Sequence, residues 1–185
     1  TTGSTGAIIG GRNPGEANTI AYNGGAGVQV LMSTLLAQIV GNRIHDNVGI
    51  GIDVGIAGVT PPDPGDVDGH PNQPVLLTAH SSGGSTIVDL AFDSAAGDYL
   101  IDFYANPGGG DPSGYGEGAQ LIATISMTHD GSGPKLLRSV VPVSGSTITA
   151  TATSVTSLET SEFSNAIDDV AAASALVPDS SIRRS

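Results

Sequence analysis

The sequence of 185 residues contains no cysteine, no tryptophan and few basic residues. Without cysteine, the chain has no disulfide, no thiolate metal site and no cysteine nucleophile. Lysine and arginine number 6 against 18 aspartates and glutamates, which gives a formal net charge of −12. Because a protein that binds a phosphate backbone needs clustered basic residues, the composition excludes a nucleic-acid partner.

Long apolar runs are also missing. The longest unbroken apolar stretches are far too short to cross a bilayer, so we expect no membrane span. The first residues have neither the basic start nor the apolar centre of a signal peptide. We therefore expect a mature or excised segment of a longer protein.

Glycine is abundant, with 27 residues, and proline contributes another 11. Their share stays below the range of collagen-like or low-complexity chains. Hydrophobic residues make up 38% of the sequence, charged residues 13% and aromatic residues 4%. This composition, rich in valine and isoleucine, favours an all-β fold.

A sequence repeat lies near the N-terminus. Residues 18–30, NTIAYNGGAGVQV, align with residues 42–54, NRIHDNVGIGIDV, so the period is twenty-four, and six of the thirteen positions are identical. The last residues of both units alternate between apolar and other types, as a half-buried strand requires. On this pattern Gln29 and Asp53 face outward.

A period of this length accommodates two or three short strands with turns, which is one coil of a parallel β-solenoid. Equivalent residues of successive coils then stack, so we expect Asn23 to lie over Asn47 in an amide ladder at a turn. Two similar hairpins in a β-sandwich are the alternative.

The repeat pattern, N-x-I-x-x-N-x-x-x-G-[VI]-x-[VI], begins within the run IGGRNPGEANTI at residues 9–20. Together they resemble the right-handed parallel β-helix repeats of secreted bacterial proteins, over roughly residues 5–56. The resemblance implies an extracellular or cell-surface location. It implies no single activity, because the same fold carries lyases, hydrolases, adhesins and inert stalks.

Past the repeat, seven strand-like segments with polar turns favour an antiparallel immunoglobulin-like sandwich. The cysteines and tryptophan of a true immunoglobulin domain are missing. The runs FYAN, DPSGYGEG and TSEFS are similar to a sandwich domain that follows β-helix repeats in large bacterial surface proteins. We expect strands at residues 75–79, 86–93, 99–105, 120–128, 135–143, 147–154 and 161–166.

The predicted fold class is therefore all-β, with a short right-handed parallel β-helix of two to three coils followed by an Ig-like β-sandwich. We expect the partial β-helix at residues 1–57 and an acidic linker or cap loop, rich in proline and glycine, at residues 58–72. The sandwich then spans residues 73–167, and a flexible tail or linker spans residues 168–185.

Calcium is the one metal ion for which the sequence contains candidate ligands. Asp63, Asp66 and Asp68, followed by Gly69, place three oxygen ligands in a short stretch of the linker. Calcium takes six to eight oxygen ligands, so these residues are candidates for a calcium site. The alternative is a solvated acidic linker.

A second acidic patch follows if the second and third predicted strands of the sandwich form a hairpin. Pairing Asp93 with Asp98 then also places Asp89 opposite Asp102, with apolar partners facing the core. Like charges directly opposite one another are destabilising. Either solvent screens them, or a cation or a basic partner surface lies there.

Catalytic candidates are few, and no nucleophile motif or phosphate loop is complete. Asp46 and Asp53 are the only carboxylates of the repeat near enough in sequence to form a glycosidase pair. His45 and Asp46 fit a solvated turn better, and Arg43 is the one basic residue beside them.

The glycine-rich loop after the third sandwich strand holds a third acidic candidate, Asp111 with Glu117. Tyr104 and Tyr115 offer faces for stacking on a sugar, although tyrosines beside glycine more often pack against turns. Neither feature identifies a ligand.

A short solenoid needs caps, because each coil buries its faces against its neighbours. The sandwich can cover the C-terminal end, whereas residues 1–6 contain no capping helix. We therefore expect upstream coils or self-association at the N-terminal end, with head-to-tail stacking into a filament as one outcome.

The expected function is a non-catalytic extracellular structural or adhesive module, either self-assembling or part of a larger surface protein. The alternative is a carbohydrate-binding or polysaccharide-degrading β-helix fragment. These two hypotheses imply a glycan or a surface protein as the partner.

Overall fold

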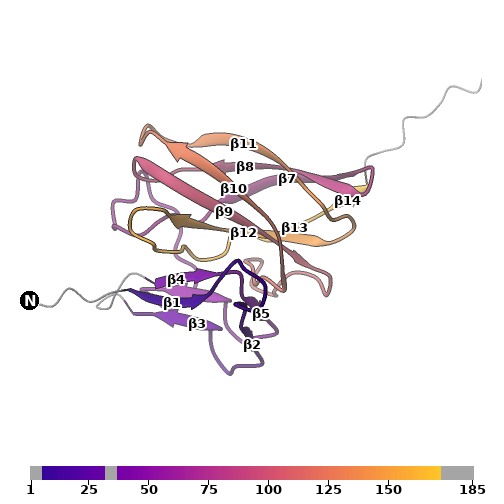
Figure 1. Ribbon diagram of the computed structural model, residues 1–185, viewed down its shortest axis with the longest axis horizontal. Coiled ribbons are helices and arrows are strands. Elements are labelled where there is room, and N and C mark those ends of the chain that lie inside the picture. The colour runs from indigo at the N-terminus through magenta and orange to yellow at the C-terminus, as the bar shows by residue number, and fades with distance from the viewer. Residues whose placement is uncertain (1–5, 32–36, 172–185) are drawn as a thin grey trace, which may run out of the picture.

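Figure 1 shows the computed structural model, which describes residues 6–31 and 37–171. Within these ranges the chain is all-β and forms no helix. A stack of short strands lies beside a body of two larger sheets (Figure 1). Since these ranges contain no helix, none is long and apolar enough to span a membrane.

The N-terminal strands stack in parallel pairs. They are β1 (Ala7–Gly10), β2 (Thr19–Ala21), β3 (Val28–Val30), β4 (Ala37–Val40), β5 (Arg43–His45) and β6 (Ile52–Val54). β1 pairs with β4, β2 with β5 and β3 with β6. Ile20 lies opposite Ile44 and Val28 opposite Ile52, so the register predicted from the repeat is confirmed.

The first coil (β1–β3) has a longer turn than the second coil (β4–β6). Ala7 lies opposite Ala37, thirty residues later, whereas Thr19 lies opposite Arg43, twenty-four residues later. The turn between β1 and β2 therefore carries six extra residues. Arg12 belongs to this longer turn.

Asparagine ladders join the two coils at two turns. Asn18 Nδ2 donates to Asn42 Oδ1 at 3.0 Å, and Asn23 Nδ2 donates to Asn47 Oδ1 at 2.8 Å. The predicted ladder of Asn23 and Asn47 is thus confirmed. Asn42 and Asn47 also accept the backbone N–H of Asn18 and Asn23, so each amide holds the turn of the neighbouring coil.

The remaining described strands form two four-stranded sheets. They are β7 (Val75–Ser82), β8 (Ser85–Phe92), β9 (Gly97–Asn106), β10 (Gln120–His129), β11 (Lys135–Val141), β12 (Thr147–Ser154), β13 (Ile167–Asp168) and β14 (Val170–Ala171). The inner sheet has the order β10-β9-β12-β13, and the outer sheet has the order β11-β8-β7-β14. Val88, Leu90, Phe103 and Ile148 belong to the buried core of this two-sheet body.

Two predictions about these strands are wrong. β8 and β9 do not form a hairpin, because they lie in different sheets. Phe92 of β8 and Tyr99 of β9 face each other from different sheets, with ring centroids 5.1 Å apart. A hairpin and a pair of strands in two facing sheets turn the same residues inward, so the alternating pattern could not distinguish them. Residues 161–166 form no strand, and the short strands β13 and β14 follow them.

A second buried cluster joins the coil stack to the two-sheet body. Ile39, Ile44 and Ile52 of the second coil pack with Tyr104 and Phe163. The rings of Tyr104 and Phe163 meet edge to face, with centroids 5.3 Å apart. Residues far along the chain therefore complete the interior of the second coil.

Candidate functional site

One edge of the coil stack is closed by two segments of the two-sheet body, residues 116–118 and 159–163, which we call the capping loops. Ile44 N donates to Gly118 O at 2.9 Å, and Gly118 N donates to Ile44 O at 2.8 Å. A Cβ at Gly118 would lie 2.6 Å from Phe163 and 2.7 Å from Tyr104, so only glycine fits there without displacing a ring. The capping loop thus continues the hydrogen bonding of β5.

Buried side chains close the rest of this edge. Each accepts a hydrogen bond from a backbone N–H of the second coil, and buried N–H groups need such partners. Glu117 accepts from Asn47 at 2.9 Å, Glu162 from Val54 at 3.0 Å, Thr160 from Ile39 at 3.0 Å and Tyr104 from Gly41 at 3.3 Å. All four acceptors are more than nine-tenths buried.

A buried ion pair ties the first coil to the inner sheet. Arg12 donates to both carboxylate oxygens of Asp102, from Nε at 3.1 Å and from Nη2 at 2.6 Å. Thr124 Oγ1 donates to the same carboxylate at 2.6 Å. The Asp102 side chain is fully buried and that of Arg12 is 25% exposed. A buried charge is stable only with partners of this kind.

The opposite edge of the stack has no such cover. Among the described residues, β1, β2 and β3 each pair with one strand only. Ile9, Ile20 and Val28 are partly buried, whereas the residues opposite them in β4, β5 and β6 are 1% exposed. We call this side of β1–β3 the open coil edge. It presents strand edges together with apolar surface.

Two of the predicted calcium ligands are used to fold the linker. Asp63 accepts hydrogen bonds from the backbone N–H of Val67 and Asp68, at 3.2 and 3.1 Å. Asp68 accepts one from the backbone N–H of His70 at 2.9 Å. In the described ranges, no three histidine, aspartate or glutamate side chains are grouped so that they could hold a metal ion.

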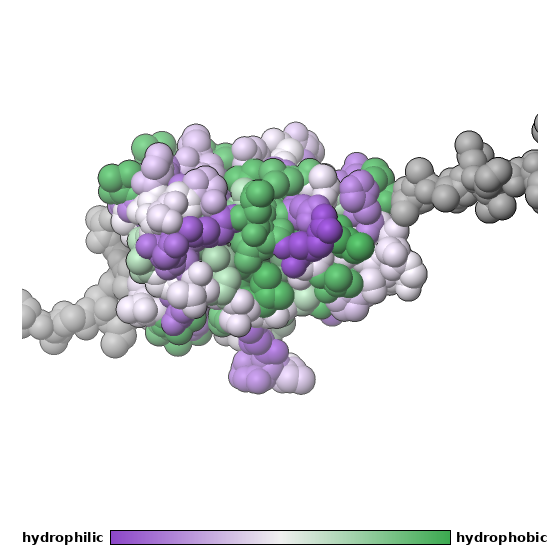
Figure 2. All heavy atoms as spheres, turned by 90° about the horizontal axis from the view of Figure 1, so that it is seen from above, coloured by the Kyte–Doolittle hydropathy of each residue, from purple (hydrophilic) through white to green (hydrophobic). Residues whose placement is uncertain are grey.

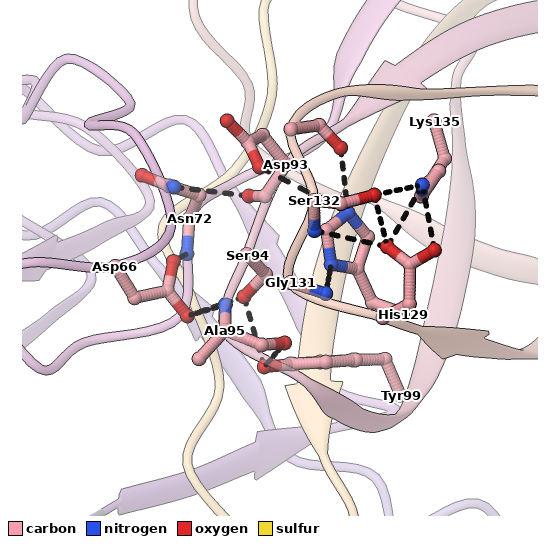
Figure 3. Close-up of polar contacts among 12 residues, drawn as sticks. Asp66, Asn72, Asp93, Ser94, Ala95, Tyr99, His129, Gly131, Ser132 and Lys135 are labelled. Carbon is pink, nitrogen blue, oxygen red and sulfur yellow. Dashed lines mark hydrogen bonds and ion pairs between the residues drawn. The ribbon is translucent and has the colours of Figure 1, made fainter.

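The third predicted calcium ligand, Asp66, clamps the linker to the turn between β8 and β9 (Figure 3). Its carboxylate accepts the backbone N–H of Ala95 at 3.0 Å, that of Asn72 at 3.1 Å, and the Ser94 hydroxyl. The Asn72 amide donates to the backbone oxygen of Asp93 at 2.9 Å. The acidic linker is therefore held against the two-sheet body by its own side chains.

The four aspartates of the predicted second patch are not brought together, because the hairpin on which the patch depended does not form. Each has a different neighbour: Asp89 pairs with Arg138, Asp93 lies 3.9 Å from His129 Nε2, Asp98 accepts from Thr128 and Asp102 pairs with Arg12. The Arg138 guanidinium lowers the pKa of Asp89 to about 2. Two of the four charges are thus balanced by arginine.

The predicted carboxylate pair of the repeat is divided between solvent and interior. The Asp46 side chain is 60% exposed and lies 2.7 Å from His45 Nδ1. Asp53 is only 6% exposed, so this outward-facing position of the repeat is covered rather than open to solvent. Asp53 faces the junction with the two-sheet body, where burial raises the pKa of Glu162 and the charge of Asp53 raises it further.

A polar cleft of about 530 Å³ lies where the second coil meets the loop after β9. Its lining includes Arg43, His45, Asp46, Asp111 and Glu117. Tyr22 is 80% exposed and contacts His45 edge to face at 6.1 Å. The cleft therefore combines charged groups with an accessible aromatic ring beside it.

The two tyrosines named as candidates for stacking on a sugar, Tyr104 and Tyr115, do not line this cleft. Tyr104 is 2% exposed and belongs to the second buried cluster, so its face is not accessible. Tyr115 forms an isolated bridge with Asn165. Burial of Tyr104 raises the pKa of its hydroxyl far above the ordinary value.

Apolar residues also gather on the outer sheet. Figure 2 looks down on this side of the molecule and shows an apolar band beside polar groups. The large apolar side chains exposed on these strands are Val75, Leu77, Leu136, Val140 and Val170. The ion pair of Asp89 and Arg138 lies in the same sheet.

Three residues that join the coils to the two-sheet body are not marked by the sequence: Arg12, Thr160 and Glu162. The only signal in the sequence is that arginine is rare. An isolated arginine in so acidic a chain is expected to pair with a carboxylate, but it has many candidate partners. Serine, threonine and glutamate in the run TSEFS resemble any polar loop. Their role depends on contacts with residues far away along the chain.

A comparison with protein-family models and with curated protein sequences finds no match to this chain. A functional assignment therefore rests on the two edges of the coil stack and on the residues that close one of them.

Proposed function

We propose that this chain is a non-catalytic structural module of a secreted or cell-surface protein, in which an Ig-like sandwich terminates a right-handed parallel β-helix. The observation that carries the proposal is the closed edge of the second coil. There the capping loops replace the hydrogen bonds that a further coil would make.

Closing this edge has a clear physical benefit. An uncovered strand edge presents free N–H and C=O groups that pair with other chains. The capping loops supply the reciprocal bonds of Gly118 with Ile44 and the buried acceptors Glu117 and Glu162. A cap of this kind keeps the stack from growing in that direction.

The closed edge also bears on how the module assembles. Head-to-tail stacking of identical copies would require the second coil of one copy to meet the first coil of the next. The capping loops occupy that position. A place at the end of a β-helix within a larger surface protein therefore agrees better with the structure than a filament built by coil stacking.

The cap is tested by Gly118→Val, with Gly108→Val as the matched control in the same connection between β9 and β10. Nothing lies within 4 Å of a Cβ at Gly108. Hydrogen exchange at Ile44 and Asn47 is the readout, together with light scattering for self-association.

We expect Gly118→Val to speed exchange at both amides by about tenfold or more and to promote association, because local opening exposes the edge. The control should change neither. A folded Gly118→Val variant that remains monomeric, with Ile44 and Asn47 as protected as in the parent, would show that the capping loop does not seal the edge.

Glycan binding at the polar cleft is the second candidate function. Aromatic rings beside clefts with a few polar groups are typical of ligand sites. Titration with neutral and acidic oligosaccharides should show binding that is lost in Tyr22→Ala and Arg43→Ala but kept in Tyr115→Ala. Equal titration curves for all four proteins would eliminate this candidate.

A further inference from the structure

We propose that the open coil edge binds a further β-coil of the same repeat, joined to the polypeptide ahead of β1. This inference rests on the proposed function, since it names what lies at the other end of a stack that the sandwich terminates. It identifies the partner by its pattern: a parallel coil with paired asparagines and alternating apolar residues.

The burial of equivalent residues supports this partner. Ile9, Ile20 and Val28 occupy the same positions in the first coil as Ile39, Ile44 and Ile52 do in the second. The second coil has covering structure on both sides, and its three isoleucines are 1% exposed. The first coil has a strand partner on one side only among the described residues, and its apolar residues are partly buried. A preceding coil would give them the missing neighbour.

The asparagine ladders indicate the register of that coil. Asn42 Oδ1 and Asn47 Oδ1 each accept an amide N–H from the asparagine of the coil before. Asn18 and Asn23 occupy the same positions one coil earlier, and no described side chain or backbone group donates to their Oδ1 atoms. Asparagines one repeat period upstream of each would donate to these oxygens in the same geometry.

A second copy of the chain is a poorer partner for this edge. The surface that would have to dock is the far edge of the second coil, and in every copy the capping loops already cover it. A coil on the same polypeptide meets no such obstacle, and it loses less entropy on docking because it is already tethered.

The test is a fusion that adds one coil ahead of Thr1 in the full chain. The added segment carries asparagine, isoleucine and valine at the spacing N-x-I-x-x-N-x-x-x-G-V-x-V, with a connection of repeat length. The matched control has the same length and composition in scrambled order. Thermal unfolding and hydrogen exchange of the β1–β3 amides are measured on both fusions and on the unfused chain.

We expect the patterned fusion to raise Tm by about 5 °C or more and to slow exchange of the β1–β3 amides by about tenfold or more. The scrambled fusion should match the unfused chain. A further fusion with alanine at both added asparagines should lose part of the gain, since it keeps the strands but removes the ladders.

Two results would overturn the inference. One is equal Tm and equal exchange in the patterned and scrambled fusions. The other is a concentration-dependent dimer of the unfused chain that already protects β1–β3, which would assign the edge to a second copy. Exchange at Ile44 and Asn47 reports on the cap and exchange in β1–β3 reports on the open edge, so the failure of either proposal is recognised separately.

Discussion

The ion pair of Arg12 and Asp102 gives the sharpest test of how the first coil is held. We consider Arg12→Ala, which leaves the fully buried Asp102 carboxylate with the single hydrogen bond from Thr124. Removing one partner of a buried pair costs about 3–5 kcal/mol. Because the Arg12 side chain is 25% exposed, water can partly replace it, so we expect a loss of about 3 kcal/mol.

In a chain of this size, a loss of about 1 kcal/mol lowers Tm by about 2–4 °C, so the expected drop is about 6–12 °C. Urea unfolding at neutral pH gives the free energy directly. A double-mutant cycle with Asp102→Asn separates the pair from the two single effects. The free energy of unfolding that Arg12→Ala loses should be largely recovered in the double variant, because neither charge is then left buried alone.

Arg138→Ala is the matched control. Arg138 binds Asp89 with the same two guanidinium nitrogens, at 2.6 and 2.9 Å, but its side chain is 70% exposed. Exposed pairs contribute little, so its loss should be several-fold smaller. If Arg12→Ala destabilises the protein no more than Arg138→Ala does, burial does not set the strength of this contact and our reasoning is wrong.

Three further changes test other parts of the structure by urea unfolding. Gly27→Ala should cost about 1–3 kcal/mol, since its Cβ would lie 2.7 Å from the backbone oxygen of Gly51, whereas Gly24→Ala meets nothing within 4 Å and should be neutral. Asp66→Asn should cost about 1–3 kcal/mol, because one oxygen that accepts linker or turn hydrogen bonds is lost; no change would mean that the clamp is dispensable. Burial raises the pKa of Glu162 above 4.5, so the folded state binds this proton more tightly than the unfolded chain does. Stability from this group therefore falls as pH rises from 4.5 through the raised pKa, and Glu162→Gln should remove that slope; an unchanged slope would refute the assignment.

The register of the coils could be predicted because the signal is local and repeated. Identical residues in two units stack directly, so the repeat period fixes which strands pair. The ladder of Asn23 and Asn47 followed from the same spacing. The six extra residues between β1 and β2 break the period for β1 alone, so its partner was not evident from the sequence.

The pairing of strands in the two-sheet body could not be read in the same way. Alternation in β8 and β9 fixes which side chains point inward, but a hairpin and a crossing between sheets bury the same set. The predicted acidic patch depended on the hairpin, so it was wrong for the same reason. The role of the linker aspartates was equally ambiguous from the sequence. Carboxylates spaced to bind calcium are also spaced to accept the backbone N–H groups of a tight turn.

The contacts of the capping loops could not be predicted from sequence patterns. Thr160 and Ile39 are 121 positions apart, and Glu162 and Val54 are 108 apart. Nothing local distinguishes these polar residues from those of an ordinary loop. Only the folded two-sheet body brings them to the coil.

These long separations have a consequence for synthesis of the protein. At about 5–20 residues per second, the ribosome needs about 5–20 s to reach Glu162 after it has made Val54. Over that interval the nascent second coil exposes strand edges that only the later segments can cover. Neighbouring nascent chains could pair at those edges. Residues 55–161, which are made during this interval, contain 11 acidic and 2 basic residues, and the resulting mutual repulsion opposes such encounters while the cap is still being made.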